Sequence, residues 1–219
     1  MTDKIQQVSN YIKEESFISF LQKSRRYIKY NIYGFTDAII FEIDLKKTYS
    51  KVNPKLKLFF RFASEKDIDL MDETQYDYNQ ITKQYSKERL AKGDRCILAL
   101  YNDKIIGYVW IMKDYMELSK KKHIILDKKK VYAYRCFVKK EYRGKRIESA
   151  LYNHATDLLK KEGKKILILT IDNDNKPALK AISKKKARYK ITGSLIHIRF
   201  FGLKYDYIRK RLRYLRNIW

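Results

Sequence analysis

The chain has 219 residues, which suits one large domain or one domain with an extension, and 45% hydrophobic residues allow a core. The formal charge of +25 predicts attraction to a polyanion such as nucleic acid, anionic lipid or a phosphorylated cofactor, although a lysine-rich compositional bias of the source genome explains it equally well. The two cysteines lie in apolar runs, which argues against a disulfide-stabilised protein. The sequence shows no signal peptide and no apolar run of about 18 residues, which argues against a membrane-spanning protein. We therefore expect a cytoplasmic protein.

The first part of the chain is predicted to form an extension. Residues 1–30 carry apolar side chains at helical spacing. Residues 27–45 are typical of two strands joined near Gly34. Because residues 46–57 are polar and break the periodicity, we place the end of the extension, a helix and a hairpin, at residue 55.

From residue 56 the pattern becomes that of a mixed α/β domain. The first elements are a strand at 56–63, a short helix at 64–71, a helix at 78–94, a hairpin at 95–112 and a charged excursion at 114–130. The next are a strand at 131–138, a helix that ends at Gly163, a strand at 166–172, a helix at 173–182 and two strands within 188–202 that meet at Gly193. This order predicts a central mixed sheet of about six or seven strands with one strand–helix–strand crossover.

The last residues, 204–219, place apolar side chains on one face and arginines on the others. This pattern predicts a basic amphipathic helix, which lies on an anionic membrane, on an acidic partner, or on the protein itself or a second subunit. The predicted organisation is therefore an extension at 1–55, a domain at 56–203 and a basic helix at 204–219.

A basic turn precedes the helix of the crossover. Gly144 lies among Arg143, Lys145 and Arg146. The start of a helix presents N–H groups and a partial positive charge, and a glycine lets the backbone approach a ligand closely. The turn therefore predicts a binding site for a phosphate or pyrophosphate. The alternative is a solvated basic turn, since the glycine spacing matches neither the dinucleotide-binding motif nor the lysine-containing nucleotide-binding loop.

Residues 138–155 resemble the acetyl-CoA-binding motif of the GCN5-related N-acetyltransferase (GNAT) superfamily, with Arg143 at its leading basic position. Residues 101–112 resemble that superfamily's second and third strands, including Gly107. Residues 168–182 resemble its fifth strand and the next helix, with Asn175, Pro177 and Ala178 in place. The resemblance spans residues 57–202 and implies an acyl-CoA N-acyltransferase-like fold.

The resemblance also implies where acetyl-CoA, or another acyl-CoA, binds. The implied cofactor-binding residues are Phe137, Val138, Lys139, Arg143, Gly144, Lys145, Arg146, Ile147, Glu148, Ser149 and Asn175. The pantetheine would pair along residues 137–139 like an added strand, and a backbone amide near Val138 would stabilise the oxyanion. Arg146 and Glu148 depart from the motif because they occupy its two small-residue positions.

The catalytic groups depart further from the pattern. The superfamily often carries a tyrosine acid where this chain has Ile182, and its usual Gly-Phe pair is here Lys186-Ala187. Asn175 and Tyr189 are the candidate catalytic residues, with Tyr189 replacing the missing acid if the helix is shifted. The candidate general bases are Asp172, Glu73 and Glu88.

The expected activity is acetyl transfer from acetyl-CoA to a primary amine of a small molecule or a protein, with a homodimer possible and with no metal, since the three histidines share no motif. The surface charge suits an acidic acceptor and not a polycationic one, unless the acidic residues between 65 and 79 line the acceptor side. Two alternatives stay open: an inactive CoA-binding regulatory module, and a basic nucleic-acid-binding protein whose 19 tyrosines stack on bases.

Overall fold

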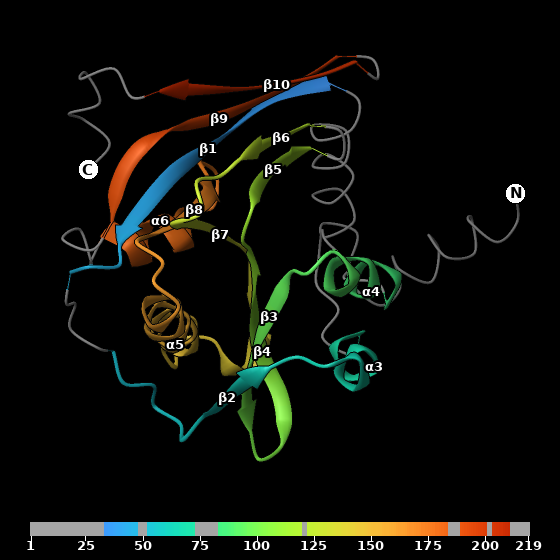
Figure 1. Cartoon of the computed structure of the whole chain (residues 1–219), viewed down its shortest axis with the longest axis vertical. Helices are drawn as coiled ribbons and strands as arrows, with labels where there is room; N and C mark the ends of the chain where they lie inside the picture. The colour runs from blue at the N-terminus through green and yellow to red at the C-terminus, as the bar shows by residue number, and fades with distance from the viewer. Residues whose placement is uncertain are drawn as a thin grey trace, which may run out of the picture.

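Eight strands form one mixed sheet in the computed structural model, which describes residues 33–47, 52–72, 83–119, 122–183, 189–200 and 203–210. The strand order is β10-β9-β1-β8-β7-β4-β3-β2 (Figure 1). The bounds are β1 Tyr33–Asp44, β2 Phe59–Phe62, β3 Arg95–Tyr101, β4 Lys104–Met112, β7 Lys130–Val138, β8 Ile166–Asp172, β9 Lys190–Phe200 and β10 Leu203–Lys210. The sheet is mixed, as predicted, but has eight strands rather than six or seven.

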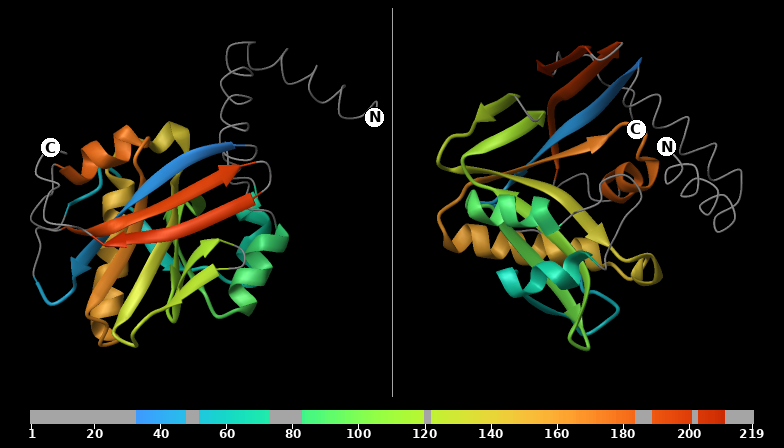
Figure 2. Two further views of the ribbon diagram at one scale, coloured as in Figure 1. Left: turned by 90° about the horizontal axis from the view of Figure 1, so that it is seen from above. Right: turned by 90° about the vertical axis from the view of Figure 1, so that its right-hand side faces the viewer.

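Helices cover both faces of the sheet (Figures 1 and 2). One face carries α5 (Ile147–Lys161) and α6 (Lys176–Ser183), whose buried Leu151 and Ile182 share one core with Phe41 of β1. The other face carries α3 (Ile68–Asp72) and α4 (Lys83–Ala91), with Trp110 of the sheet fully buried among the residues there. We call these the α5 face and the α4 face. The predicted short helix, second helix and crossover helix are confirmed.

The centre of the sheet follows directly from local sequence. In β4 every residue after Lys104 is buried, as expected for a strand covered on both faces. The β3–β4 turn has positive φ at Asn102 (48°) and Asp103 (60°), the conformation of a two-residue type I′ hairpin. The hairpin predicted at residues 95–112 is therefore confirmed.

The N-terminal hairpin was predicted wrongly. Gly34 makes no turn, because β1 runs through it as one strand that pairs antiparallel with β8 on one side and β9 on the other. The strand is buried at Ile39, Phe41 and Ile43, so it belongs to the core of the sheet. The helix predicted within residues 1–30 lies outside the described residues, and the domain boundary at residue 55 stays a prediction.

The C-terminal part differs from the prediction as well. Gly193 lies within β9, where the register with β1 shifts so that Ile40 faces Gly193 and Phe41 faces Ile191; it marks a bulge, not a turn. The basic helix is wrong over residues 203–210, which form β10 along β9. Tyrosine and isoleucine suit strands, and the unpaired edge of β9 offered main-chain partners that a helical pattern cannot reveal. Residues 211–219 lie outside the described part.

The charged excursion at 114–130 contains a small hairpin, β5 (Tyr115–Ser119) with β6 (Lys122–Ile125), which the sequence did not predict. Its buried Met116 packs with Tyr132 and Leu195 on the α4 face of the main sheet. The hairpin therefore extends the cover of that face beyond α4.

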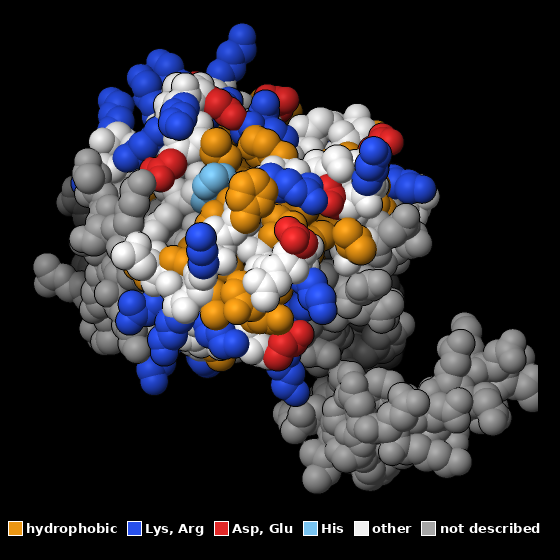
Figure 3. Space-filling view, turned by 90° about the horizontal axis from the view of Figure 1, so that it is seen from below, with side chains coloured by type: hydrophobic (Ala, Val, Ile, Leu, Met, Phe, Trp, Pro, Cys, Tyr) orange, Lys and Arg blue, Asp and Glu red, His pale blue; other side chains and the backbone are white. Residues whose placement is uncertain are grey.

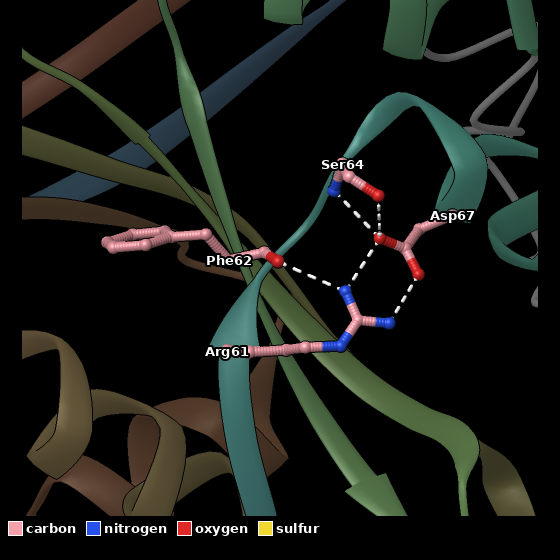
Figure 4. A network of polar contacts seen from close by, with 4 residues as sticks. All are labelled: Arg61, Phe62, Ser64 and Asp67. Carbon is pink, nitrogen blue, oxygen red and sulfur yellow. Dashed lines mark hydrogen bonds and ion pairs between the residues drawn. The ribbon is translucent and has the colours of Figure 1, made fainter.

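An ion pair ties β2 to the turn after it (Figure 4). Arg61 donates from Nη1 and Nη2 to the two carboxylate oxygens of Asp67, at 2.7 and 2.5 Å. The main-chain N–H and hydroxyl of Ser64 donate to the same carboxylate, at 2.7 and 2.8 Å. The Arg61 hydrogen bond holds the pKa of buried Asp67 well below its usual range, although burial opposes this.

We expect Asp67→Asn to lower the free energy of unfolding at pH 7 by about 1–2 kcal/mol, since Arg61 is partly exposed and solvent screens the pair. Because the folded pKa of Asp67 is depressed, its contribution is complete above about pH 4 and is lost as the pH falls below that. Urea unfolding at pH 7 and pH 3 should therefore show the gap between wild type and variant narrowing in acid. Glu65→Gln, exposed in the same turn, is the control; an Asp67→Asn deficit of equal size at both pH values would contradict the assignment.

Candidate functional site

Two central strands separate at the middle of the sheet. β7 and β8 pair in parallel only from Lys130 with Ile166 to Ala133 with Leu169, although both strands continue. Beyond that point β7 runs on beside β4 while β8 stays beside β1 (Figure 1). We call the diverging ends, residues 134–138 and 170–172, the fork. At its closed end the hydroxyl of Tyr132 lies 2.8 Å from Thr170 Oγ1.

A bulge shapes the β7 side of the fork. Tyr108 faces Phe137 and Trp110 faces Tyr134, so two residues of β7 oppose one of β4. One of the two, Arg135, has a φ of 47°, the left-handed conformation that rarely suits a side chain with a Cβ. The bulge re-aims the rest of β7 towards the turn before α5.

The end of β7 leaves one main-chain edge directed into the fork. Lys139 N donates to Ile106 O at 2.9 Å, so residues 137 and 139 direct their main-chain groups to β4. By the alternation of a strand, the N–H and C=O of Val138 point the other way, into the fork. There Arg143 Nε donates to Val138 O at 3.1 Å.

Gly107 makes the close approach of β4 and β7 possible. A Cβ at this position would lie 2.8 Å from the carbonyl oxygen of Phe137 and 3.5 Å from side-chain atoms of Val138 and Leu151. Any larger residue would push the strands apart at the fork. The glycine singled out in the sequence therefore has a steric reason.

The basic turn leads from the fork into α5. Gly144 has a φ of 74°, and a Cβ there would meet no atom within 4 Å. Arg146 is the N-cap, in the left-handed region at φ 65°, and a guanidinium has no acceptor with which to cap the helix. The first helical bond runs from Ala150 N to Arg146 O at 3.1 Å, so the helix starts immediately after the three basic residues. Backbone donors, the helix dipole and these cations thus converge on one turn.

Aromatic side chains border this turn. Lys145 Nζ lies 4.9 Å from the ring centroid of Tyr142, and Tyr142 meets Tyr101 at 6.2 Å between ring centroids. Phe60 of β2 stacks on His154 of α5, with 4.9 Å between the ring centroids. Seen from below, hydrophobic side chains gather at the centre of the molecule with lysines and arginines around them (Figure 3).

A group of phenols and a thiol lies on the α5 face of the fork. Burial raises the pKa of Tyr152 well above its usual range, and neighbouring Cys136, Glu148 and Tyr189 add to this. Burial likewise raises the pKa of the Cys136 thiol, although a hydrogen bond with Tyr152 opposes it. Cys136 and Tyr152 are therefore neutral at pH 7, and Tyr152 has Cys136 of the fork, Glu148 of the first turn of α5 and Tyr189 as neighbours on this face.

A buried charge network occupies the α4 face of the fork. Arg89 Nε donates to Asp94 Oδ2 at 2.6 Å and to the hydroxyl of Tyr134 at 2.9 Å, while Nη1 donates to Glu117 at 2.8 Å. The Tyr134 hydroxyl donates to Asp94 at 2.6 Å. Burial raises the pKa of Asp94, whereas Tyr134 and Arg89 lower it. The network ties α4 to the first residue of the fork in β7 and carries two carboxylates against one guanidinium.

The sequence did not point to this network. Arg89 and Asp94 fall within the helix predicted at residues 78–94, and Tyr134 lies 40 residues beyond Asp94. Burial is what distinguishes Arg89 from the other charged residues of α4. The sequence of α4 is too weakly amphipathic to predict which side of the helix faces the sheet.

The candidate catalytic residues lie in different surroundings. Asn175 caps α6, since its Oδ1 accepts from Ala178 N at 3.2 Å. Ile182 belongs to α6 itself, and its apolar side chain is buried in the core. Tyr189, just before β9, is half-buried and meets Phe41 edge-to-face at 6.1 Å.

Among the candidate bases, Asp172 is exposed at the open end of β8, within the fork. Glu88 is exposed on α4, where it accepts from Gln84 at 2.8 Å. Glu73 lies outside the described residues. Asp172 is thus the candidate that a fork strand carries.

No cluster of three or more metal-ligating side chains occurs within the described ranges. Among the helices that the structure describes, none is long and apolar enough to cross a membrane.

Comparisons with known proteins agree with this arrangement. A sequence profile of the Acetyltransferase (GNAT) family matches residues 58–184. A GCN5-related N-acetyltransferase from Sphaerobacter thermophilus has a TM-score of 0.56 at 14% identity, covering 86% of this chain and 56% of that chain. A functionally unknown conserved protein from Staphylococcus epidermidis has a TM-score of 0.53 at 13% identity, covering 87% and 70%.

A third structure, the PaiA N-acetyltransferase from Thermoplasma acidophilum in complex with coenzyme A, has a TM-score of 0.47 at 18% identity, covering 59% of this chain and 89% of that chain. No curated protein matches the sequence. At these identities the structural likeness concerns the fold alone, whereas the profile covers more than half of the chain, including the fork, the basic turn and α5. The resemblance found in the sequence is confirmed, and the chain belongs to the Acetyltransferase (GNAT) family.

Proposed function

We propose that this protein transfers an acetyl group, or another acyl group, from an acyl-CoA to a primary amine. The proposal rests on one observation: the strand that presents a main-chain edge for the thioester leads directly into the helix whose start suits the phosphates. The start of α5 can hold a diphosphate, and β7, which leads into it, directs a main-chain edge at Val138 into the fork. A nucleotide thioester held at one end therefore has its acyl carbon within reach of the other.

The residues at the turn suit the phosphates of CoA. Backbone N–H groups at the start of α5 and the cations of Arg143, Lys145 and Arg146 favour an anion. The Tyr142 ring beside Lys145 offers a surface on which an adenine ring stacks. The pantetheine arm follows residues 137–139 into the fork, where it pairs like an added strand.

In the reaction, the neutral amine attacks the thioester carbonyl. The new C–N bond forms, the C–S bond breaks, the amine proton passes to a base, and the CoA sulfur takes a proton as it leaves. The N–H of Val138 stabilises the oxyanion. We assign Asp172, on the fork strand β8, as the base, acting directly or through water, and Tyr189, a neighbour of Tyr152 on the α5 face, as the acid.

The acceptor enters from the α4 face, because the α5 face is taken by the cofactor. Asp94 and Glu117 outnumber Arg89 there, which favours a cationic amine over an anionic acceptor. A small-molecule amine and a protein lysine both meet this description.

Two measurements test the proposal. Saturating acetyl-CoA, at about 100 times its Kd, should raise the free energy of unfolding by about 2.7 kcal/mol, and free thiol should appear with an amine panel. Stabilisation without thiol release would favour the inactive regulatory module instead. No stabilisation, together with steeply salt-dependent binding of RNA or DNA, would favour the nucleic-acid alternative.

Glu148 offers a test with effects of opposite sign. It is an exposed carboxylate in the first turn of α5, where it stabilises the helix but repels a phosphate. We expect Glu148→Gln to lower stability by about 0.3–1 kcal/mol while tightening acetyl-CoA binding by about two- to fivefold at low salt. Calorimetric titration and urea unfolding measure the two effects; Glu141→Gln, exposed before the turn, is the control. Weaker binding of CoA by Glu148→Gln would show that the carboxylate accepts a bond from the ligand.

A further inference from the structure

A segment outside the family profile runs along α5 to the basic turn. Between β1 and β2, the edge strand next to β3, the described residues 45–47 and 52–57 lie against α5 and its two ends (Figure 1). We call residues 45–57 the connecting segment; residues 48–51 of it are not described. The profile of the family begins at residue 58, so the segment belongs to this chain's own N-terminal part.

Four hydrogen bonds follow the course of the segment. Leu45 N donates to Lys165 O (2.8 Å) after the C-terminal end of α5, and Lys160 Nζ donates to Lys47 O (2.9 Å). The middle contact is from Asn153 Nδ2 to Val52 O, at 3.3 Å. The last is from Lys55 N to Lys145 O, at 3.1 Å. The segment thus passes from the C-terminal end of the helix to its N-terminal turn.

Lys55 is therefore held beside the turn by its own main chain. Its partner Lys145 immediately precedes the N-cap of α5. Leu56 and Leu58 pack against the core, so the segment is anchored on the C-terminal side of Lys55 as well. The Lys55 side chain is exposed, and a lysine is a compact charge on a flexible stem that suits a phosphate.

We propose that Lys55 completes the phosphate-binding site at the start of α5, contacting a phosphate of the acyl-CoA. The inference rests on the proposed function. CoA offers two sources of this chemistry, the diphosphate that bridges to pantetheine and the phosphate on the ribose. Because Lys55 lies outside the residues that the family profile matches, the affinity for the cofactor depends on the connecting segment.

The test compares Lys55→Gln with Lys47→Gln by calorimetric titration of CoA and of 3′-dephospho-CoA. Lys47 is an exposed lysine of the same segment, near the other end of α5, so the two variants lose the same charge. Glutamine keeps the main-chain bond of Lys55, and urea unfolding should show wild-type stability. We expect Lys55→Gln to weaken CoA binding by about three- to tenfold, with a shallower salt dependence, and Lys47→Gln to change it by less than about twofold.

The two ligands locate the contact. A loss seen with CoA but not with 3′-dephospho-CoA assigns Lys55 to the ribose phosphate, and an equal loss with both assigns it to the diphosphate. Equal affinities of both variants and the wild type would overturn the inference while leaving the proposed function intact. A wild-type chain that binds neither ligand would overturn both.

Discussion

Gly144→Val should weaken acetyl-CoA binding by about tenfold or more. Gly144 has a φ of 74°, and a β-branched residue in that region costs about 1–3 kcal/mol, so the turn would shift to relieve the strain. A shift of the turn moves the backbone donors and the cations of Arg143 and Lys145 away from the phosphates. Calorimetric titration of acetyl-CoA measures the loss.

The chain contains a matched control for this substitution. Gly163 also has a φ of 74°, and a Cβ there would likewise meet nothing within 4 Å, but it lies after the other end of α5. Gly163→Val should therefore cost similar stability and leave the affinity for acetyl-CoA unchanged. If both variants bind acetyl-CoA like the wild type, the turn does not hold the phosphates. The Gly→Ala pair repeats the comparison under milder strain should the valine variants fail to fold.

Asp94→Ala should lower the free energy of unfolding by about 3–5 kcal/mol, a large fraction of the stability of a typical domain. Arg89 and Asp94 have side chains only 4% and 3% exposed, so removal of the carboxylate leaves a buried guanidinium without its main counter-charge. The partner that stays, Glu117, is 32% exposed and compensates only in part. Urea unfolding measures the change.

Two further variants test whether the loss of stability comes from burying an unpaired charge or from losing any ion pair. Glu42→Ala breaks a partly exposed pair with Lys130, 3.6 Å long, and should cost less than about 1 kcal/mol. The double variant Arg89→Met, Asp94→Leu removes both buried charges and should recover much of the stability lost in Asp94→Ala. A small effect of Asp94→Ala, equal to that of Glu42→Ala, would mean that water reaches Arg89.

The basic turn is a part of the candidate site that local sequence can predict. A strand, a glycine among cations and an amphipathic helix are consecutive in the chain, so their meeting point could be predicted from residues 131–161 alone. Gly93 and Gly163 adopt positive φ just after predicted helices, as helix C-termini often require, and Gly144 adopts it in the turn before the crossover helix. The β3–β4 hairpin follows from the same local rules.

The network of Arg89, Asp94 and Tyr134 shows the limit. Its members come from α4, the loop after it and β7, and nothing in their spacing indicates that they meet. The same holds for Lys55 and Lys145, 90 residues apart in the numbering, which one main-chain bond brings together. Contacts between distant segments depend on the order of the strands in the sheet. The hydrophobic periodicity of the sequence does not predict that order.

The sequence by itself determined the family, the crossover with its basic turn, and most elements between residues 57 and 183, because hydrophobic period, caps and turn residues act over a few positions. Only the tertiary structure decided that residues 33–44 are a central strand, that residues 203–210 are a strand rather than a helix, and that β7 and β8 diverge at Ala133 and Leu169. For the two strands, unpaired main-chain groups of a neighbouring strand override the preferences of the local segment, whereas β7 leaves β8 at the bulge that contains Arg135.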